Sequence, residues 1–317
     1  MSAATSEALS GVVAESRAMR ELVPLVLRLA ATRSPVLLEG ESGTGKDLVA
    51  HWLHYGGPRR EGPFVKVHCP SIPGELLESE LFGHERGAFT DARQAKAGKI
   101  EMAAGGTLYF DQVQDLAPQL QAKLLRVVEE RRFERVGGTR TIEVDVRFLA
   151  SASQDLAELV RTGRFREDLF HRLNVVRLAL APLRSRREDV LPLAEAFLAR
   201  ERASAATRAS GFAPETEELL RGYRWPGNVR ELRAVVERAA LLTGEGPIEP
   251  RALPPELVEP PSALWAGRER RPTLRDVEQA YIRHVLEATG GSQTRAAAVL
   301  GISRKALWEK RRRFGIG

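Results

Sequence analysis

A glycine-rich loop that ends in lysine lies between a short apolar run and an amphipathic run. The loop occupies positions 40–46, after the strand-like residues 36–39 and before the helix-like residues 47–54. In this context glycines let backbone amides turn toward phosphate oxygens, the helix N-terminus adds partial positive charge, and lysine adds a full charge. The pattern predicts an α/β fold with a nucleotide site formed by Gly40, Glu41, Ser42, Gly43, Thr44, Gly45, Lys46 and Asp47.

Short apolar runs alternate with amphipathic stretches through the first 180 residues. Residues 64–68, 107–111 and 146–150 are such runs, and buried runs between helical segments indicate a parallel sheet. Residues 181–246 have helical patterns only. Residues 247–272 hold seven of the 18 prolines, and this proline content indicates a linker rather than a packed element. The predicted organisation is a tail over 1–10, an α/β subdomain over 11–180, a helical subdomain over 181–246, a linker over 247–272 and a small all-α domain over 273–317.

The positive charge of the chain is concentrated in its last fifty residues. Residues 268–317 hold 12 basic and 5 acidic side chains, which leaves 36 basic and 37 acidic in the rest. Such asymmetry indicates a C-terminal module that binds a polyanion. Cys69 is the single cysteine, and the sequence has neither a signal peptide nor a run of about 18 apolar residues. We therefore expect a cytoplasmic protein with no membrane partner.

A second strand-like run, residues 105–111, ends in the carboxylate of Asp111. A buried strand that delivers one acid beside bound phosphates is what a magnesium-organising motif needs. Asp47 follows the loop lysine, at a position where the general pattern has a Ser or Thr that binds magnesium. Asp111 is therefore the predicted Mg²⁺ ligand.

Four segments resemble, in order, the motifs of the bacterial enhancer-binding proteins, the sigma-54-dependent transcription activators of the AAA+ class. The resemblance extends from about residue 11 to residue 317, and its motifs are long and specific. It implies an AAA+ P-loop domain with a parallel sheet and a helical lid. The segments are the Walker A loop at 40–47, the segment with the GAFTGA loop at 78–92, the arginine-finger segment at 163–174 and the sensor II segment at 225–232.

The resemblance also implies a mechanism. A ring, usually a homo-hexamer, binds ATP between subunits, and hydrolysis moves loops that push on sigma-54 in the RNA polymerase holoenzyme. Carried over by position, Arg166 and Arg172 reach the neighbour's γ-phosphate, while Arg230 contacts phosphates within its own subunit. Phe89 and Thr90 become the sigma-54 contacts. About ten residues precede the matched region, so we expect no N-terminal regulatory domain. The activity would then be controlled by a trans-acting regulator or by the expression level of the protein, or would not be controlled at all.

Four positions depart from the family pattern. Gln112 replaces the Glu that polarises the attacking water, His68 replaces Asn, residues 151–153 lack the usual Thr and Asn, and Asp91 replaces Gly. Loss of a general base costs about 10²–10⁴-fold in rate. The sequence therefore predicts slow or absent hydrolysis at Asp111 and Gln112, unless Asp115 or a repositioned water compensates.

The C-terminal domain has the pattern of a helix-turn-helix. Apolar residues at Leu274, Val277, Tyr281 and Val285 follow helical spacing, and two further short helices follow, with a glycine-containing turn between them. The layout resembles the Fis-type DNA-binding domain. We expect base contacts from Ser303, Arg304 and Lys305, and phosphate contacts from Lys310, Arg312 and Arg313.

Several functions remain open on the sequence alone. The first is a sigma-54-dependent regulator that binds ATP and enhancer-type DNA. The second is a DNA-binding scaffold or repressor that binds ATP without hydrolysing it efficiently, favoured by the residues at 68, 112 and 153. A small-molecule P-loop kinase needs neither the arginine segment nor the basic module. A helical bundle that binds another protein is the alternative for the C-terminal domain.

Overall fold

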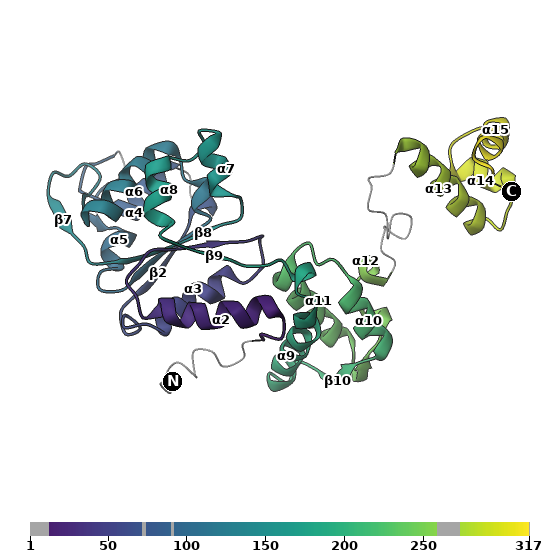
Figure 1. Ribbon diagram of the computed structural model, residues 1–317, viewed down its shortest axis with the longest axis horizontal. Helices are drawn as coiled ribbons and strands as arrows, with labels where there is room; N and C mark the ends of the chain where they lie inside the picture. Colours follow the sequence, from purple (N-terminus) through teal and green to yellow (C-terminus); the bar gives the residue numbers. More distant parts are fainter. Residues whose placement is uncertain (1–12, 72–73, 90–91, 259–272, 317) are drawn as a thin grey trace. The chain divides into compact units, whose positions relative to one another are not determined.

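A computed structural model describes residues 13–71, 74–89, 92–258 and 273–316. Two compact units span residues 1–252 and 253–317. The first unit contains a five-stranded sheet between two helical layers, followed by a mainly helical lid (Figure 1). The second unit contains a small helical bundle. Within the described ranges, no helix is both long and apolar enough to cross a membrane.

The central sheet is entirely parallel, as the apolar runs predicted. Its order is β2-β5-β8-β1-β9, and β1 lies between β8 and β9. Because parallel strands end at one edge, the side chains that end β1, β2 and β5 come together beside the phosphate loop. The strands are β1 (Val36–Glu39), β2 (Phe64–His68), β5 (Thr107–Asp111), β8 (Arg147–Ala152) and β9 (Val176–Ala179).

Helices cover both faces of the sheet because its side chains alternate between two apolar cores (Figure 1). Leu37 belongs to one core, whereas Val36 and Leu38 belong to the other. One face packs against α2 (Arg17–Ala30) and α3 (Lys46–Tyr55). The other packs against α4 (Gly74–Phe82), α5 (Lys99–Met102), α6 (Pro118–Glu130), α7 (Leu156–Arg161) and α8 (Glu167–Leu173). The hairpins are β3 (Gly83–His84) with β4 (Lys96–Ala97), and β6 (Arg132–Glu134) with β7 (Thr141–Glu143).

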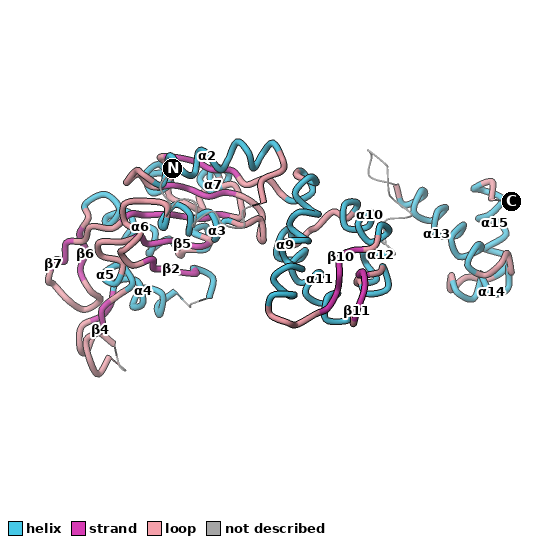
Figure 2. Tube along the Cα trace, turned by 90° about the horizontal axis from the view of Figure 1, so that it is seen from below, coloured by secondary structure: helices cyan, strands magenta, loops and turns pink. Residues whose placement is uncertain are grey.

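The lid is not purely helical, which corrects the sequence interpretation. Its helices are α9 (Val190–Ala203), α10 (Pro214–Gly222) and α11 (Asn228–Leu242), and a parallel pair of strands lies beside them, β10 (Arg208–Phe212) and β11 (Glu245–Ile248) (Figure 2). The prediction of a linker from residue 247 is also wrong for its first part, since Ile248, Leu253 and Leu257 are buried. Proline at the first position of α12 (Pro255–Val258) starts that helix instead of preventing packing. Residues 259–272 of the predicted linker lie outside the described residues.

The C-terminal bundle contains α13 (Leu274–Ala288), α14 (Gln293–Val299) and α15 (Arg304–Phe314). Its core is formed by Ile282, Val285, Leu286, Ala296, Ala297, Leu307 and Phe314. Tyr281, expected on the inner face of α13, is 46% exposed, because the buried face runs through Ile282 and Leu286 instead. Ser303 caps α15, because its hydroxyl accepts the backbone amide of Ala306 at 3.1 Å.

Candidate functional site

The phosphate loop, residues 40–45, connects the end of β1 to the start of α3. Gly43 and Gly45 have φ angles of 80° and 107°, a region that favours glycine. A Cβ at Gly43 would lie 2.3 Å from the carbonyl oxygen of Gly227 in the lid, so only glycine lets the lid pack this closely. Helix α3 has ten residues, and its first amides favour an anion at the loop.

Lys46 is folded over the backbone of this loop. Its Nζ donates to the carbonyl oxygens of Gly40 at 2.6 Å and Glu41 at 2.9 Å. The residue is 7% exposed, and this burial lowers the pKa of its ammonium group. The positive charge of Lys46 therefore lies at the phosphate loop, where the sequence predicted that it would bind phosphate oxygens.

Lid side chains contact Glu41 and Ser42 of the same loop. Arg184 donates two hydrogen bonds of 2.7 and 2.5 Å to the carboxylate of Glu41, and Asn228 donates to that carboxylate at 3.2 Å. These bonds, that of Arg184 first, lower the pKa of Glu41 to about 2. Arg230 donates to the hydroxyl of Ser42 at 3.0 Å. The sequence predicted Arg230 beside the loop but missed Arg184 and Asn228, whose contacts depend on how the lid docks.

The carboxylate of Asp111 ends β5 beside the loop, as predicted. Its Oδ1 accepts from the hydroxyl of Ser151 at 2.7 Å, and its Oδ2 lies 2.9 Å from both Nζ of Lys66 and Nδ1 of His68. Burial by itself raises the pKa of Asp111, but hydrogen bonds from Lys66 and Ser151 outweigh it and lower the pKa overall. The group is therefore an ionised carboxylate at neutral pH.

Lys66 also contacts Asp47, the residue after the loop lysine. Its Nζ lies 2.6 Å from Oδ2 of Asp47, whose Oδ1 accepts from the hydroxyl of Tyr109 at 3.0 Å. The sequence interpretation missed Lys66. Its position two residues before His68 in β2 could have identified it, because alternate strand residues point to the same face.

His68, where the family pattern has Asn, contacts the aspartate at the end of β5. It lies opposite Asp111 in the parallel pairing of β2 and β5, and its ring contacts that carboxylate. Gln112 has left-handed backbone angles, φ 61° and ψ 58°, and its backbone amide donates to the hydroxyl of Ser151 at 3.0 Å. The side chain of Gln114, not identified from the sequence, donates to the hydroxyl of Ser153 at 3.1 Å.

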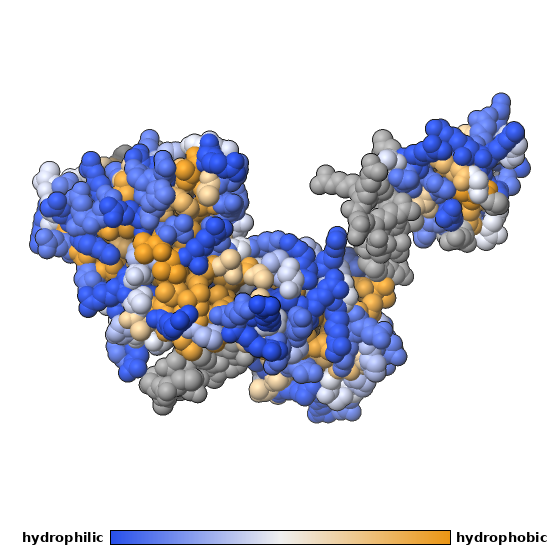
Figure 3. Space-filling view, in the orientation of Figure 1, coloured by the Kyte–Doolittle hydropathy of each residue, from blue (hydrophilic) through white to orange (hydrophobic). Residues whose placement is uncertain are grey.

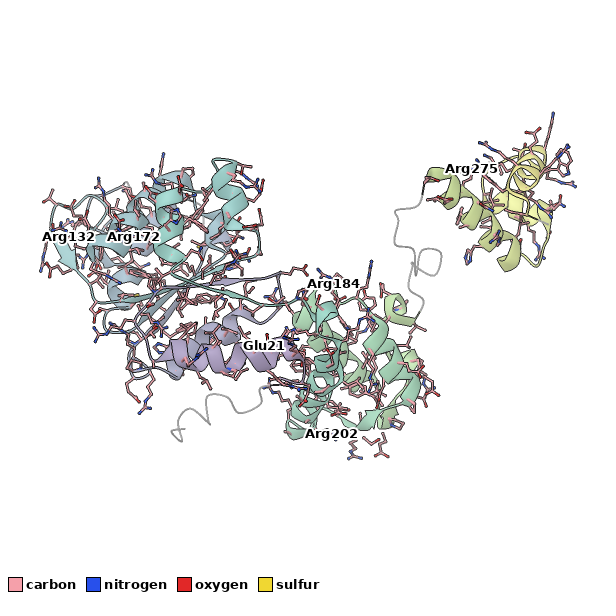
Figure 4. The ribbon with its side chains drawn as sticks, in the orientation of Figure 1. Glu21, Arg132, Arg172, Arg184, Arg202 and Arg275 are labelled. Atoms are coloured by element: carbon pink, nitrogen blue, oxygen red, sulfur yellow. The ribbon has the colours of Figure 1, made fainter. Side chains whose placement is uncertain are left out.

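The two predicted finger arginines lie on the surface around α8. Arg166 pairs with Asp168 at 2.7 Å and Arg172 pairs with Glu129 at 2.6 Å, with side chains 47% and 59% exposed. Figure 4 shows Arg172 well apart from Arg184, which contacts the phosphate loop. Arg172 is therefore remote from the phosphate loop of its own chain.

The predicted sigma-54 loop, residues 87–92, lies between β3 and β4 in the chain. Phe89 is 42% exposed, and its ring packs edge-on against His84 at 4.9 Å. The amide of Gly87 donates to the carbonyl of Ala92 at 2.8 Å, which closes the base of the loop. Thr90 and Asp91 lie outside the described residues.

Helix α15 presents a basic outer face. Arg304, Lys305, Arg312 and Arg313 are exposed. Trp308, which the sequence interpretation did not select, is 53% exposed, and the Arg312 guanidinium lies 5.6 Å from its ring centroid.

Two of the predicted DNA-binding side chains, Ser303 and Lys310, already have partners within the C-terminal bundle. Nζ of Lys310 pairs with Glu278 of α13, and the hydroxyl of Ser303 is used as the helix cap. The sequence could not show the pairing of Lys310, because its partner lies on another helix. Their DNA contacts stay predictions.

Comparisons with known proteins follow this architecture. Family models match in order: the sigma-54 interaction domain over residues 12–179, the AAA+ ATPase lid domain over 184–266, and the Fis family of bacterial regulatory proteins over 273–314. The chain belongs to the sigma-54-dependent transcriptional activators. The family resemblance and the AAA+ fold with a helix-turn-helix domain, both predicted from the motifs, are thereby confirmed.

Individual sigma-54-dependent activators match over nearly the whole chain. Regulatory protein AtoC of Escherichia coli is 43% identical over 96% of this chain and 68% of its own length. Transcriptional regulatory protein ZraR of Klebsiella oxytoca is 47% identical over 96% of this chain and 69% of its own length. The crystal structure of NtrX from Brucella abortus has a TM-score of 0.74 at 37% identity, covering 98% of this chain and 71% of NtrX. NtrX has also been solved with ADP and with ATP.

Proposed function

We propose that this activator binds ATP at the phosphate loop, assembles as a ring, contacts sigma-54 through residues 87–92 and binds enhancer-type DNA through α15. The observation that carries the proposal is the enclosure of the loop, with Lys46 folded over its backbone and Arg230 of the lid on Ser42. NtrX, which shares the fold, binds both ATP and ADP in its crystals, and this supports a nucleotide here. Because promoter DNA and polymerase are its partners, its place of action is the cytoplasm.

Mg²⁺ is the metal that we propose for the bound nucleotide. Carboxylate oxygens are the ligands that it prefers, and Asp111 presents two beside the loop. The fit requires the ammonium of Lys66 to leave Oδ2 of Asp111. When bound, Mg²⁺ would supply positive charge to the phosphate oxygens, and Lys46 would add a second positive charge at the loop.

The ring proposal rests on two features of the surface. Arg166 and Arg172 are exposed, and Arg172 lies remote from its own loop, so a neighbouring subunit's γ-phosphate is the target that we propose for them. Apolar side chains gather on the surface around α3 and β9 (Figure 3). Leu48 of α3 and Val175, the residue before β9, are more than half exposed. Exposed apolar patches of this kind mark protein interfaces.

A second function is favoured by Gln112. An amide at this position cannot accept the proton of an attacking water, so ATP binding with little hydrolysis would make the chain a DNA-bound scaffold or repressor. The two functions predict the same nucleotide affinity but different phosphate release. They are separated by turnover, not by binding.

Calorimetric titration of the full chain with ATP tests the proposal. We expect micromolar or tighter binding that Lys46→Ala abolishes, while Lys123→Ala, which removes an exposed lysine from α6, changes nothing. Steady-state phosphate release on the same samples then decides between activator and scaffold. Absence of ATP binding by the wild-type chain would refute both functions.

A further inference from the structure

The ammonium of Lys66 lies between two carboxylates that come from different elements. Nζ is 2.6 Å from Oδ2 of Asp47, in the first turn of α3, and 2.9 Å from Oδ2 of Asp111, at the end of β5. Strand β2 puts it there because Lys66 pairs in register with Tyr109, two residues before the pair of His68 with Asp111. The aromatic ring of Tyr109 flanks the ammonium at 5.6 Å, and its hydroxyl orients Asp47.

This cluster is partly shielded from water. The side chain of Asp111 is 12% exposed and that of Lys66 is 35% exposed. The Nζ of Lys66 forms an ion pair with each of the two carboxylates. Two carboxylates so placed beside a phosphate loop would repel a nucleotide, and the single positive charge between them offsets that repulsion.

We propose that Lys66 is a built-in counter-ion of the nucleotide site, which lets the chain hold a nucleotide without a divalent cation and which Mg²⁺ must displace from Asp111. The inference rests on the proposed nucleotide site and deepens it. Lys66 would then determine how strongly the nucleotide affinity depends on a divalent cation. A purely structural ion pair between β2 and α3 would instead affect stability and leave that dependence unchanged.

The test measures ADP affinity of the full chain by calorimetry, in EDTA and in excess Mg²⁺, because ADP excludes hydrolysis. For the wild type we expect the two dissociation constants to differ by less than about threefold. Lys66→Met keeps the length and removes the charge, so ADP binding in EDTA should weaken at least about tenfold while binding in Mg²⁺ is largely retained. Lys66→Arg keeps the charge and should retain ADP binding in EDTA.

A metal readout completes the experiment. Mn²⁺ binding to the ADP complex, followed by electron paramagnetic resonance, should be at least about tenfold tighter in Lys66→Met than in the wild type, because no ammonium competes for Asp111. Lys123→Met is the matched control, since it removes another paired lysine, on α6 against Glu78, away from the site.

The outcomes separate this inference from the proposed function. Equal metal dependence in wild type, Lys66→Met and Lys123→Met would make Lys66 a structural ion pair and overturn the inference, while ADP binding itself would keep the proposed site. A wild-type affinity more than about tenfold weaker in EDTA than in Mg²⁺ would overturn it whether or not the variants fold. No ADP binding in either condition would refute the proposed nucleotide site as well.

Discussion

Nδ1 of His68 lies 2.9 Å from Oδ2 of Asp111, the residue directly opposite it in the pairing of β2 and β5. In the family pattern, asparagine stands at position 68 and glutamate at position 112. Here the ring contacts the aspartate itself, and residue 112 is a glutamine. Substitutions at 68 and 112 therefore act on two different groups of the site.

Restoring the acid at position 112 is expected to raise ATP turnover. Gln112→Glu supplies a group that accepts the proton of the attacking water, and we expect an increase of about 10–10³-fold in phosphate release. The gain is incomplete because Ser153 and His68 also differ from the family pattern. Coupled-enzyme measurement of phosphate release checks it, with Gln112→Asn, a shorter amide that cannot accept a proton either, as the control that should show no gain.

The gain should also depend on a neighbouring subunit. Arg166→Ala in the Gln112→Glu background should remove the new turnover and spare ATP binding, because we propose that this arginine acts across the subunit boundary. A wild-type rate at the ordinary AAA+ level, unchanged by Gln112→Glu, would show that another group activates the water.

Removal of the Ser151 hydroxyl is expected to destabilise the fold. The fully buried hydroxyl donates to Asp111 at 2.7 Å and accepts the amide of Gln112 at 3.0 Å. Ser151→Ala leaves both partners short of a hydrogen bond, so the free energy of unfolding should fall by about 1–3 kcal/mol in urea denaturation. Ser153→Ala, which affects the more accessible bond from Gln114, should cost less than about 1 kcal/mol, and equal losses would contradict the account.

Arg312 and Lys310 should differ in their contribution to DNA binding although both are basic residues of α15. Arg312 is exposed, so Arg312→Ala should weaken binding to duplex DNA and reduce the slope of log affinity against log salt by about 1. Lys310 is paired with Glu278, so Lys310→Ala should leave that slope nearly unchanged. Fluorescence anisotropy at several salt concentrations measures both, and a larger slope change for Lys310 would place the binding face elsewhere.

The lid–loop contact at Glu41 predicts a pH dependence. Hydrogen bonds from Arg184 and Asn228 lower the pKa of Glu41 to about 2, against about 4.3 in an unfolded chain. A lowered pKa means that the contact stabilises the fold above about pH 4.3 and loses its effect as pH falls toward 2. Because the side chain is 42% exposed, we expect less than about 1 kcal/mol. The difference in unfolding free energy between wild type and Glu41→Gln should therefore shrink from pH 7 to pH 3, and a constant difference would contradict this.

Much of the central fold could be predicted because its signals are local. The apolar runs that contain Leu37, Leu108 and Phe148 are short, flanked by helical patterns and buried on both faces, which is characteristic of parallel strands. The glycine loop and Asp111 follow such runs directly, so their meeting at one sheet edge follows from the topology.

Features that depend on distant pairing were missed. Strand β10 pairs with β11, which comes after α10 and α11, and neither strand has a clear alternating pattern. Arg184 and Asn228 contact the loop only because the lid docks on it. Tyr281 was assigned to the core by spacing alone, whereas the helix packs through the adjacent face.

The most direct test of the account is co-elution of the purified chain with sigma-54 in size-exclusion chromatography, with ADP and an aluminium fluoride transition-state analogue. The account predicts a complex that needs the nucleotide analogue and is lost in both Lys46→Ala and Phe89→Ala, because nucleotide binding and the 87–92 loop are both required. Lys123→Ala should form the complex as the wild type does. No complex in any nucleotide state, from a chain that binds ADP normally, would contradict the central claim that this site drives contact with sigma-54.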